Sequence, residues 1–177
     1  MIYPPLDDSM LLAEEVKKYC QGKTVLDMGT GSGIQAEKAF KNNAKSVTAV
    51  DINNESAKIL QSKGIKFIQS DLFSNVQGEF DLLIFNPPYL PLDPREDGES
   101  SLATTGGKRG DELILRFLKQ AQSHLTKKGL ILLVVSSLTP KNLIKRLLRE
   151  LGMKFEKLSE KKLFMEKLEV WKISKDF

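Results

Sequence analysis

Short apolar runs alternate with amphipathic stretches along the first half of the chain. Each run is rich in aliphatic and β-branched residues, as in buried strands, and the runs cover residues 24–28, 46–50, 66–69 and 82–85. The stretches between them repeat apolar positions at helical spacing, at about 10–18, 34–41 and 54–62. Strands separated by helices favour a parallel sheet with crossover helices. We therefore predict a doubly wound α/β fold.

The second half of the chain continues this pattern and changes it at the end. The expected elements are a helix at about 111–125, a strand at 130–135, a helix from Thr139-Pro140 to about Leu151, and strands at 155–158 and 164–173. Thr139-Pro140 has the form of an N-cap and first helical turn, and Gly152 is a typical stop. Because the last two strands follow one another closely, we expect them to pair antiparallel. The sheet is thus predicted to have seven strands, mostly parallel, with an antiparallel carboxyl-terminal strand.

Length and composition limit the number of domains, the cellular location and the kinds of site that the chain can have. A chain of 177 residues suits a single domain, 1–177, and 41% hydrophobic with 28% charged residues is typical of a globular protein. No run of about 18 apolar residues and no amino-terminal signal pattern occurs, so we expect a cytoplasmic protein without a membrane span. One Cys and one His cannot form a metal site by themselves, and we predict none. Cys20 and His124 are interpreted as structural.

Basic residues are concentrated at the carboxyl end. Residues 141–177 hold 11 Lys or Arg against 6 Asp or Glu, within a net charge of +4. Such a tail could contact RNA or a ribosomal partner. A solvated lysine-rich surface is favoured, because aromatic residues are not interleaved to stack on bases.

A glycine-rich turn follows the first predicted strand. Gly29-Thr30-Gly31-Ser32-Gly33 can bring the backbone close to a ligand. A dinucleotide fingerprint would need a further glycine where Ile34 stands. The turn also follows Asp27, whose carboxylate suits a cationic group better than a pyrophosphate. We therefore expect a different nucleoside cofactor at this turn.

Polar side chains stand at the carboxyl ends of the next three strands. Asp51 can accept hydrogen bonds from both hydroxyls of a ribose. Asp71 can accept one from the exocyclic amine of an adenine, while Leu72 covers the face of the base. Asn86 follows the fourth strand. Since the carboxyl ends of parallel strands meet at one edge, these groups with Asp27 predict a site for a nucleoside cofactor with a positively charged centre.

The stretch Asn86-Pro87-Pro88-Tyr89 carries the candidate chemistry. Its two prolines hold their φ angles fixed and stiffen the loop. The Asn86 carboxamide and the Pro87 carbonyl are acceptors that can grip an NH2 group, and the Tyr89 ring offers a flat surface. These parts suit a planar nitrogen that must be positioned before it attacks an electrophile. A proline turn with Tyr89 as a packing residue is the alternative.

Two further segments are candidates for covering this site. Residues 90–109 form a long polar loop, which we interpret as a substrate-binding flap. The proline-stiffened entry Tyr3-Pro4-Pro5 could fold over a cofactor as a lid. Asp8 and Ser9 can be explained as caps of the first helix.

These motifs resemble the class I S-adenosylmethionine-dependent methyltransferases, which have a Rossmann-like fold. The match runs from Tyr3 to about Phe117, and within the superfamily the chain is similar to the HemK family of protein-glutamine methyltransferases. The features that carry the resemblance are the Tyr-Pro-Pro…Asp-Ser opening, the Asn-Pro-Pro-Tyr loop and Gly106-Gly107-Lys108-Arg109-Gly110. They indicate the short archaeal and eukaryotic branch, which acts on the Gly-Gly-Gln glutamine of class I release factors in translation termination.

The resemblance implies a role for each matching residue. It places Asp27, Gly29 and Gly31 around the methionine end of S-adenosylmethionine, Asp51 at the ribose, Asp71 and Leu72 at the adenine, and Ser9 and Asn86 against the cofactor. It makes Asn86, Pro87, Pro88 and Tyr89 the catalytic loop that holds the substrate amide. The expected reaction is direct, in-line methyl transfer without a covalent enzyme intermediate.

The resemblance also implies partners and leaves alternatives open. Members of the branch work with a small zinc-binding activator subunit, which would pair here with the edge strand Lys66–Gln69. The amino-terminal helical domain of the bacterial enzymes is not found in this sequence. An RNA or DNA base amino-methyltransferase, a protein-lysine methyltransferase and a non-catalytic scaffold with the same fold remain alternatives. A dehydrogenase is disfavoured by Ile34 and by the Asn-Pro-Pro-Tyr loop.

Overall fold

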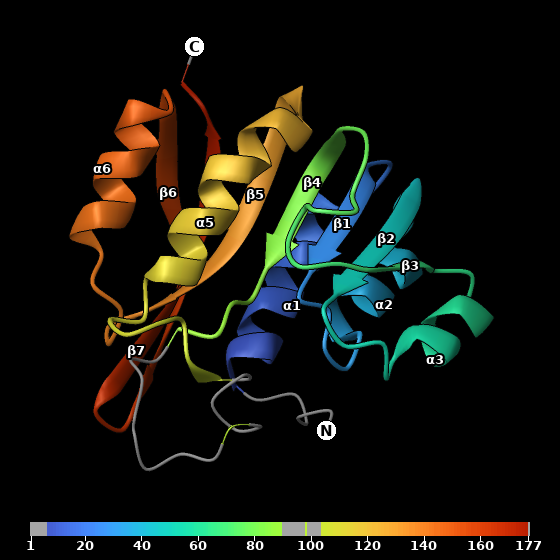
Figure 1. Cartoon of the computed structure of the whole chain (residues 1–177), viewed down its shortest axis with the longest axis horizontal. Coiled ribbons are helices and arrows are strands. Elements are labelled where there is room, and N and C mark those ends of the chain that lie inside the picture. Colours follow the sequence, from blue (N-terminus) through green and yellow to red (C-terminus); the bar gives the residue numbers. More distant parts are fainter. Residues whose placement is uncertain (1–6, 90–97, 99–103, 177) are drawn as a thin grey trace.

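The computed structural model describes residues 7–89, 98 and 104–176, and in this part of the chain one mixed sheet forms the centre. The sheet has seven strands in the order β3-β2-β1-β4-β5-β7-β6 (Figure 1). The strands are β1 Thr24–Met28, β2 Ser46–Asp51, β3 Lys66–Gln69, β4 Phe80–Phe85, β5 Leu125–Ser136, β6 Met153–Leu163 and β7 Glu166–Lys175. The first five are parallel, and β7 is antiparallel to both of its neighbours. The predicted sheet is confirmed.

Helices cover both faces of the sheet, which confirms the doubly wound arrangement (Figure 1). One face packs against α1 Asp7–Tyr19, α2 Ile34–Lys41 and α3 Ala57–Ser62. The other face packs against α5 Glu112–Ala121 and α6 Asn142–Glu150, with the short 3-10 turn η1 Gln122–His124 after α5. None of the helices in the described ranges is long and apolar enough to cross a membrane.

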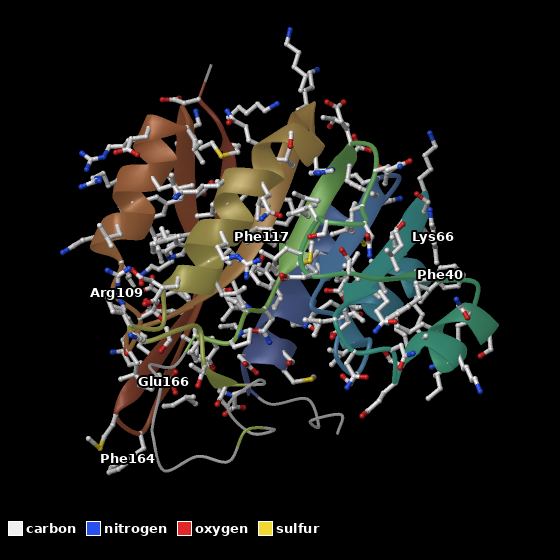
Figure 2. All side chains as sticks on the ribbon, in the orientation of Figure 1. Phe40, Lys66, Arg109, Phe117, Phe164 and Glu166 are labelled. Atoms are coloured by element: carbon white, nitrogen blue, oxygen red, sulfur yellow. The ribbon has the colours of Figure 1, made fainter. Side chains whose placement is uncertain are left out.

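The core under α5 fixes the end of β4. The rings of Phe85 and Phe117 lie 4.4 Å apart between centroids, and Phe117 also stacks on Phe73 at 5.5 Å. Phe117 is fully buried near the middle of the sheet (Figure 2). Because Phe85 immediately precedes Asn86, this aromatic packing sets the position from which the Asn-Pro-Pro-Tyr loop leaves the sheet.

The first three helices differ in part from the prediction. Helix α2 has the predicted bounds, whereas α1 begins earlier, at Asp7. The prediction that this helix begins at about residue 54 was wrong, because α3 begins at Ala57. The Asn53 side chain instead accepts a hydrogen bond from the Glu55 N–H at 2.9 Å, which is a local turn before the helix.

Strand β5 and helix α6 begin at other residues than predicted. β5 starts at Leu125, so Gly129 lies within the strand. A side chain at Gly129 would come within 2.7 Å of Leu125 and 3.0 Å of the Phe80 carbonyl, which explains why glycine fits there. Helix α6 begins at Asn142, so Thr139-Pro140 is not its N-cap and first turn. The Thr139 hydroxyl donates to the Tyr89 carbonyl instead, at 3.0 Å.

The last two strands form a hairpin, in which β6 is longer than predicted and β7 has the predicted length but begins two residues later, at Glu166. Leu163 pairs with Glu166, so Phe164 lies in the connecting turn and does not begin a strand. The pair is antiparallel, as predicted. The hairpin makes β6 one edge of the sheet and leaves β3 as the other, which confirms Lys66–Gln69 as an edge strand.

Candidate active site

The sheet register brings the predicted site residues to one edge. Met28 of β1 pairs with Val50 of β2 on one side and with Phe85 of β4 on the other. The residues that follow these three, Gly29, Asp51 and Asn86, therefore lie at the same level, with Asp51 as the last residue of β2. The prediction that the strand ends meet is confirmed for this part of the site.

The glycine turn is tied directly to Asp51. The Gly31 N–H donates to Asp51 Oδ2 at 2.8 Å, and the Asn53 N–H donates to Asp51 Oδ1 at 2.9 Å. Gly29 and Gly31 have positive φ angles of 62° and 51°, which side chains disfavour. Asp51 is thus oriented by two backbone groups, and lone pairs on both of its oxygens are left for further donors.

Asp27 is buried beneath this turn. Its Oδ2 accepts hydrogen bonds from the Thr30 hydroxyl at 2.6 Å and from the Ala36 N–H at 3.1 Å. Burial raises the pKa of Asp27 to about 7, although these two hydrogen bonds act in the opposite direction. Asp27 therefore joins the turn to the first residues of α2. Its predicted role toward a cationic group remains a prediction.

A second cluster surrounds Asp71. Arg116 of α5 contacts Asp71 Oδ2 through Nη2 at 3.0 Å, and both side chains are about half exposed. One helical turn further, the Gln120 side chain accepts from the Phe73 N–H at 3.3 Å. Leu72 lies between these two contacts with a φ of 49° and is nearly buried. Arg116 was not predicted as a site residue, because a charged residue on an amphipathic helix gives no sign of the loop that it contacts.

The Asn86 side-chain amide makes a hydrogen bond through its nitrogen but not, among the described residues, through its oxygen. Its Nδ2 donates to the Ser9 hydroxyl at 3.2 Å, and its Oδ1 is buried with no hydrogen-bond partner among the described residues. A buried acceptor without a donor is costly, so this oxygen suits a ligand that brings an N–H. The Ser9 backbone carbonyl accepts from Gln35 Nε2 at 2.8 Å, which fixes the first turn of α1 against α2.

Tyr89 is held at both ends. Its hydroxyl donates to Asp8 Oδ2 at 3.3 Å, and its carbonyl accepts from Thr139. Burial, together with the nearby carboxylates of Asp8 and Glu166, raises the pKa of Tyr89 well above its usual range, so the phenol stays neutral. Asp8 lies within the first turn of α1, where Oδ1 accepts from the Ser9 N–H at 2.6 Å. Its contact with Tyr89 was not predicted, since 81 positions separate the two.

The segment before α5, residues 106–111, packs against the Asn-Pro-Pro-Tyr loop. A side chain at Gly106 would lie 2.6 Å from the Pro88 carbonyl oxygen, so only glycine fits this approach. The Gly106 carbonyl accepts from the Leu113 N–H at 3.0 Å, and Glu112 accepts from the N–H groups of Arg109 and Gly110 at 3.1 Å each. Most of the predicted flap, 90–97 and 99–103, and the predicted lid Tyr3-Pro4-Pro5 lie outside the described residues.

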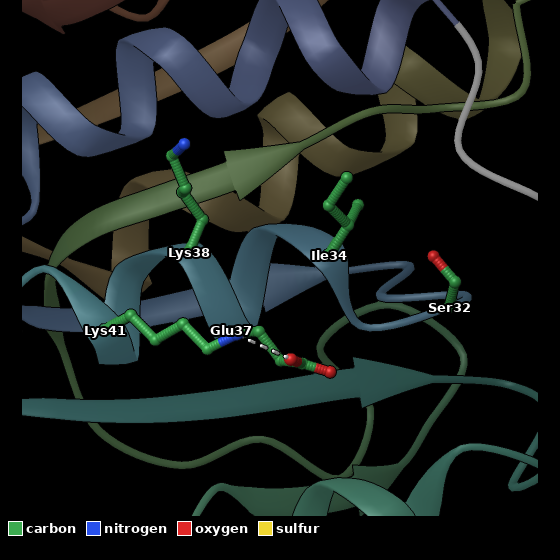
Figure 3. Close-up of a pocket in the computed structure, with 5 residues that line it drawn as sticks. All are labelled: Ser32, Ile34, Glu37, Lys38 and Lys41. Carbon is green, nitrogen blue, oxygen red and sulfur yellow. Dashed lines mark ion pairs between the residues drawn. The ribbon is translucent and has the colours of Figure 1, made fainter.

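A shallow hollow of about 300 Å³ lies beside α2 and is separate from these contacts (Figure 3). It is lined by Ser32, Ile34, Glu37, Lys38 and Lys41. Glu37 is already paired with Lys41 at 3.5 Å and with Lys63 at 2.6 Å. Of the predicted glycine turn only Ser32 lines this hollow, and none of the residues assigned to the cofactor or the substrate does, so we interpret it as ordinary surface.

The chain also resembles known proteins along most of its length. Residues 6–165 match the family model described as "Methyltransferase small domain". A Methanocaldococcus jannaschii protein, provisionally named protein N5-glutamine methyltransferase, is 37% identical over 96% of this chain and 89% of its own. A Lactococcus lactis release factor glutamine methyltransferase is 31% identical over 71% of this chain, which spans about half (51%) of that longer relative.

Among solved structures, the E. cuniculi Mtq2-Trm112 complex contains a chain of nearly the same size. It aligns with a TM-score of 0.74 and 28% identity over 98% of both chains. The doubly wound sheet with a glycine turn and an Asn-Pro-Pro-Tyr loop at one edge defines a class I S-adenosylmethionine-dependent N-methyltransferase, and S-adenosylmethionine is its cofactor. This chain belongs to the methyltransferase small domain family.

Proposed function

We propose that this protein transfers a methyl group from S-adenosylmethionine to the side-chain amide of a glutamine, the one in the Gly-Gly-Gln motif of a translation release factor. The observation that carries the proposal is the buried Asn86 Oδ1, which has no hydrogen-bond partner among the described residues. Together with the carbonyl of Pro87, the next residue in the chain, this acceptor would match the two hydrogens of an amide NH2. The names of the M. jannaschii and L. lactis relatives support glutamine as the target, and the latter names the release factor.

The residues of the site fit the proposed cofactor. The glycine turn would pass close to the methionine end, with Asp27 holding the turn in shape. Asp51 would accept the ribose hydroxyls with the lone pairs that Gly31 and Asn53 leave free. Asp71 and Leu72 would hold the adenine, and Ser9 would approach the cofactor from α1.

The chemistry follows from positioning. When bound, S-adenosylmethionine supplies a methyl group on a positively charged sulfur. Asn86 Oδ1 and the Pro87 carbonyl would orient the amide NH2, while Pro88 keeps the loop stiff and the neutral Tyr89 ring covers the flat amide. The nitrogen would bond to the methyl carbon as the sulfur–methyl bond breaks, so that the sulfur would leave as a neutral thioether and the nitrogen would lose one proton to water. Acceptors that are already in place favour the nitrogen geometry needed for attack.

A small activator subunit is part of the proposal, and we infer that it binds zinc. The E. cuniculi complex contains a second protein, Trm112, beside Mtq2. The two edges of the sheet differ in a way that favours pairing at β3. Strand β6 carries four lysines along its edge, which discourage pairing, whereas β3 offers the half-buried Phe67 and Ile68.

The test measures transfer of labelled methyl from S-adenosylmethionine to the cognate class I release factor, with the activator subunit present. We expect label on the wild-type release factor and none on a version whose Gly-Gly-Gln glutamine is changed to alanine. Mass spectrometry of the labelled peptide would locate the methyl group. Label on RNA, on DNA or on a lysine, with the glutamine unmodified, would contradict the proposal and favour one of the alternative substrates.

A further inference from the structure

The β6–β7 hairpin ends in two exposed apolar residues. Phe164 and Met165 form the two-residue turn between Leu163 and Glu166, and their side chains are 94% and 83% exposed. They are the most exposed large apolar side chains in the described part of the chain. Such residues normally lie inside a protein or at an interface.

This tip projects from the edge that bears the active site. The last residue of β5, Ser136, pairs with Leu168, so the hairpin continues beyond the carboxyl end of β5. Figure 2 shows Phe164 at the far end of the hairpin, on the same side of the molecule as Glu166 and Arg109. Arg109 belongs to the segment that supports the Asn-Pro-Pro-Tyr loop. A molecule that reaches Asn86 therefore approaches the edge from which the tip extends.

The sequence of the tip conflicts with its local structure in two further ways. Met165 has a φ of 63°, a left-handed conformation that favours glycine or asparagine. One pair further from the turn, Lys162 lies opposite Lys167, and like charges in that position repel, although Lys167 is also paired with Glu169 at 3.2 Å. Local conflicts of this kind are expected where a residue serves a function rather than the fold.

The hairpin is nevertheless held firmly at its base. Glu166 accepts from the Ser136 hydroxyl at 2.6 Å, and the backbone of Lys167 exchanges hydrogen bonds with Ser137 at 2.8 and 2.9 Å. Lys161 also contacts Asp7 at 2.6 Å, at the start of the helix that carries Ser9. The tip thus has a defined position relative to the catalytic loop.

We propose that the Phe164-Met165 tip docks into an apolar pocket with an acidic rim on the folded protein substrate, beside the target glutamine. The apolar pair would fill the pocket, and Lys162 would face the rim, since Lys167 is already paired with Glu169 at 3.2 Å. This inference rests on the proposed function, since it requires a protein substrate. A glutamine side chain offers little to distinguish one protein from another, and contact at a distance from the reacting amide supplies the missing selectivity.

The test replaces the tip with a turn that the hairpin should accept. The double variant Phe164→Asn/Met165→Gly places glycine at the position with positive φ, which glycine adopts without strain, so we expect no loss of thermal stability. Its KM for the folded release factor should rise by about ten-fold, as on loss of an apolar anchor. Its KM for a short peptide containing the Gly-Gly-Gln motif and its Kd for S-adenosylmethionine should equal those of the wild type.

Phe40→Ser is the matched control, because Phe40 is a 46% exposed aromatic residue on α2, and its KM for the release factor should not change. An unchanged KM of the double variant for the release factor, or equal losses on protein and peptide, would overturn the inference. So would binding to phosphatidylserine vesicles that is lost in the double variant without a change in KM. If the wild type gives no glutamine-dependent label, the proposed function fails and this inference falls with it.

Discussion

The Asn86 amide donates to the Ser9 hydroxyl across 3.2 Å, and this contact joins residues 77 positions apart. It orients the amide so that Nδ2 faces α1, while the buried Oδ1 has no hydrogen-bond partner among the described residues. The first helix is therefore tied to the proposed active site and is not only a cover for the sheet. A change in this helix should affect turnover even where it does not touch the substrate.

Changing Asn86 to alanine should remove catalysis and leave cofactor binding nearly intact. The loss of a positioned hydrogen-bonding group typically lowers kcat by about 10²- to 10³-fold. Single-turnover methyl transfer and calorimetric titration with S-adenosylmethionine measure the two effects separately. Ser9→Ala should give a smaller loss in kcat, with Ser62→Ala on the exposed side of α3 as its control. A Kd that weakens in step with kcat in Asn86→Ala would contradict the role assigned to this side chain.

Changing Gly106 to alanine should lower kcat through the catalytic loop. The new methyl group would lie 2.6 Å from the Pro88 carbonyl oxygen, and neither backbone segment can give way easily. We expect a loss of about 10²-fold in kcat, because small displacements of positioning groups have effects of that size. Comparison of kcat with the midpoint of thermal unfolding separates this effect from general unfolding. Wild-type kcat would show that the segment before α5 does not support the loop.

The ion pair between Arg116 and Asp71 should influence cofactor affinity. Removing the Arg116 guanidinium frees the Asp71 carboxylate to rotate, so Arg116→Ala should weaken S-adenosylmethionine binding by about 2- to 5-fold, the range of a half-exposed pair. Raising the salt concentration should reduce the difference, because exposed charges are screened. Lys119→Ala, an exposed change on the same helix, is the control. Tighter binding by Arg116→Ala would mean that the arginine competes with the adenine.

The buried Asp27 should make stability depend on pH. Because burial raises its pKa in the folded protein to about 7, the folded state holds a proton that the unfolded chain releases near pH 4. Its contribution to the free energy of unfolding is thus fully present below about pH 4 and is lost as the pH rises to about 7. Urea unfolding of the wild type and of Asp27→Asn between pH 4 and 8 measures this. The variant should lack that part of the pH dependence; parallel curves for the two proteins would contradict the prediction.

The sequence by itself determined the strands of the sheet and which polar residues follow each other along its edge. The bounds of β1, α2 and β3 were predicted as observed, because each is set by a local pattern of apolar residues that ends at a polar or glycine residue. The meeting of Gly29, Asp51 and Asn86 followed from the same reasoning, since parallel strands end together. These features depend on neighbours in the sequence and on general rules of strand pairing.

Only the tertiary structure decided which side chains touch across the site. Thr139 has the local form of a helix cap, yet its hydroxyl binds the Tyr89 carbonyl, and Asp8 binds the hydroxyl of the same tyrosine. Arg116 reaches Asp71 because the packing of Phe117 against Phe85 fixes the rotation of α5 over the sheet. Contacts of this kind join residues tens of positions apart, and their partners depend on how helices pack on the sheet. No local pattern in the chain encodes that packing.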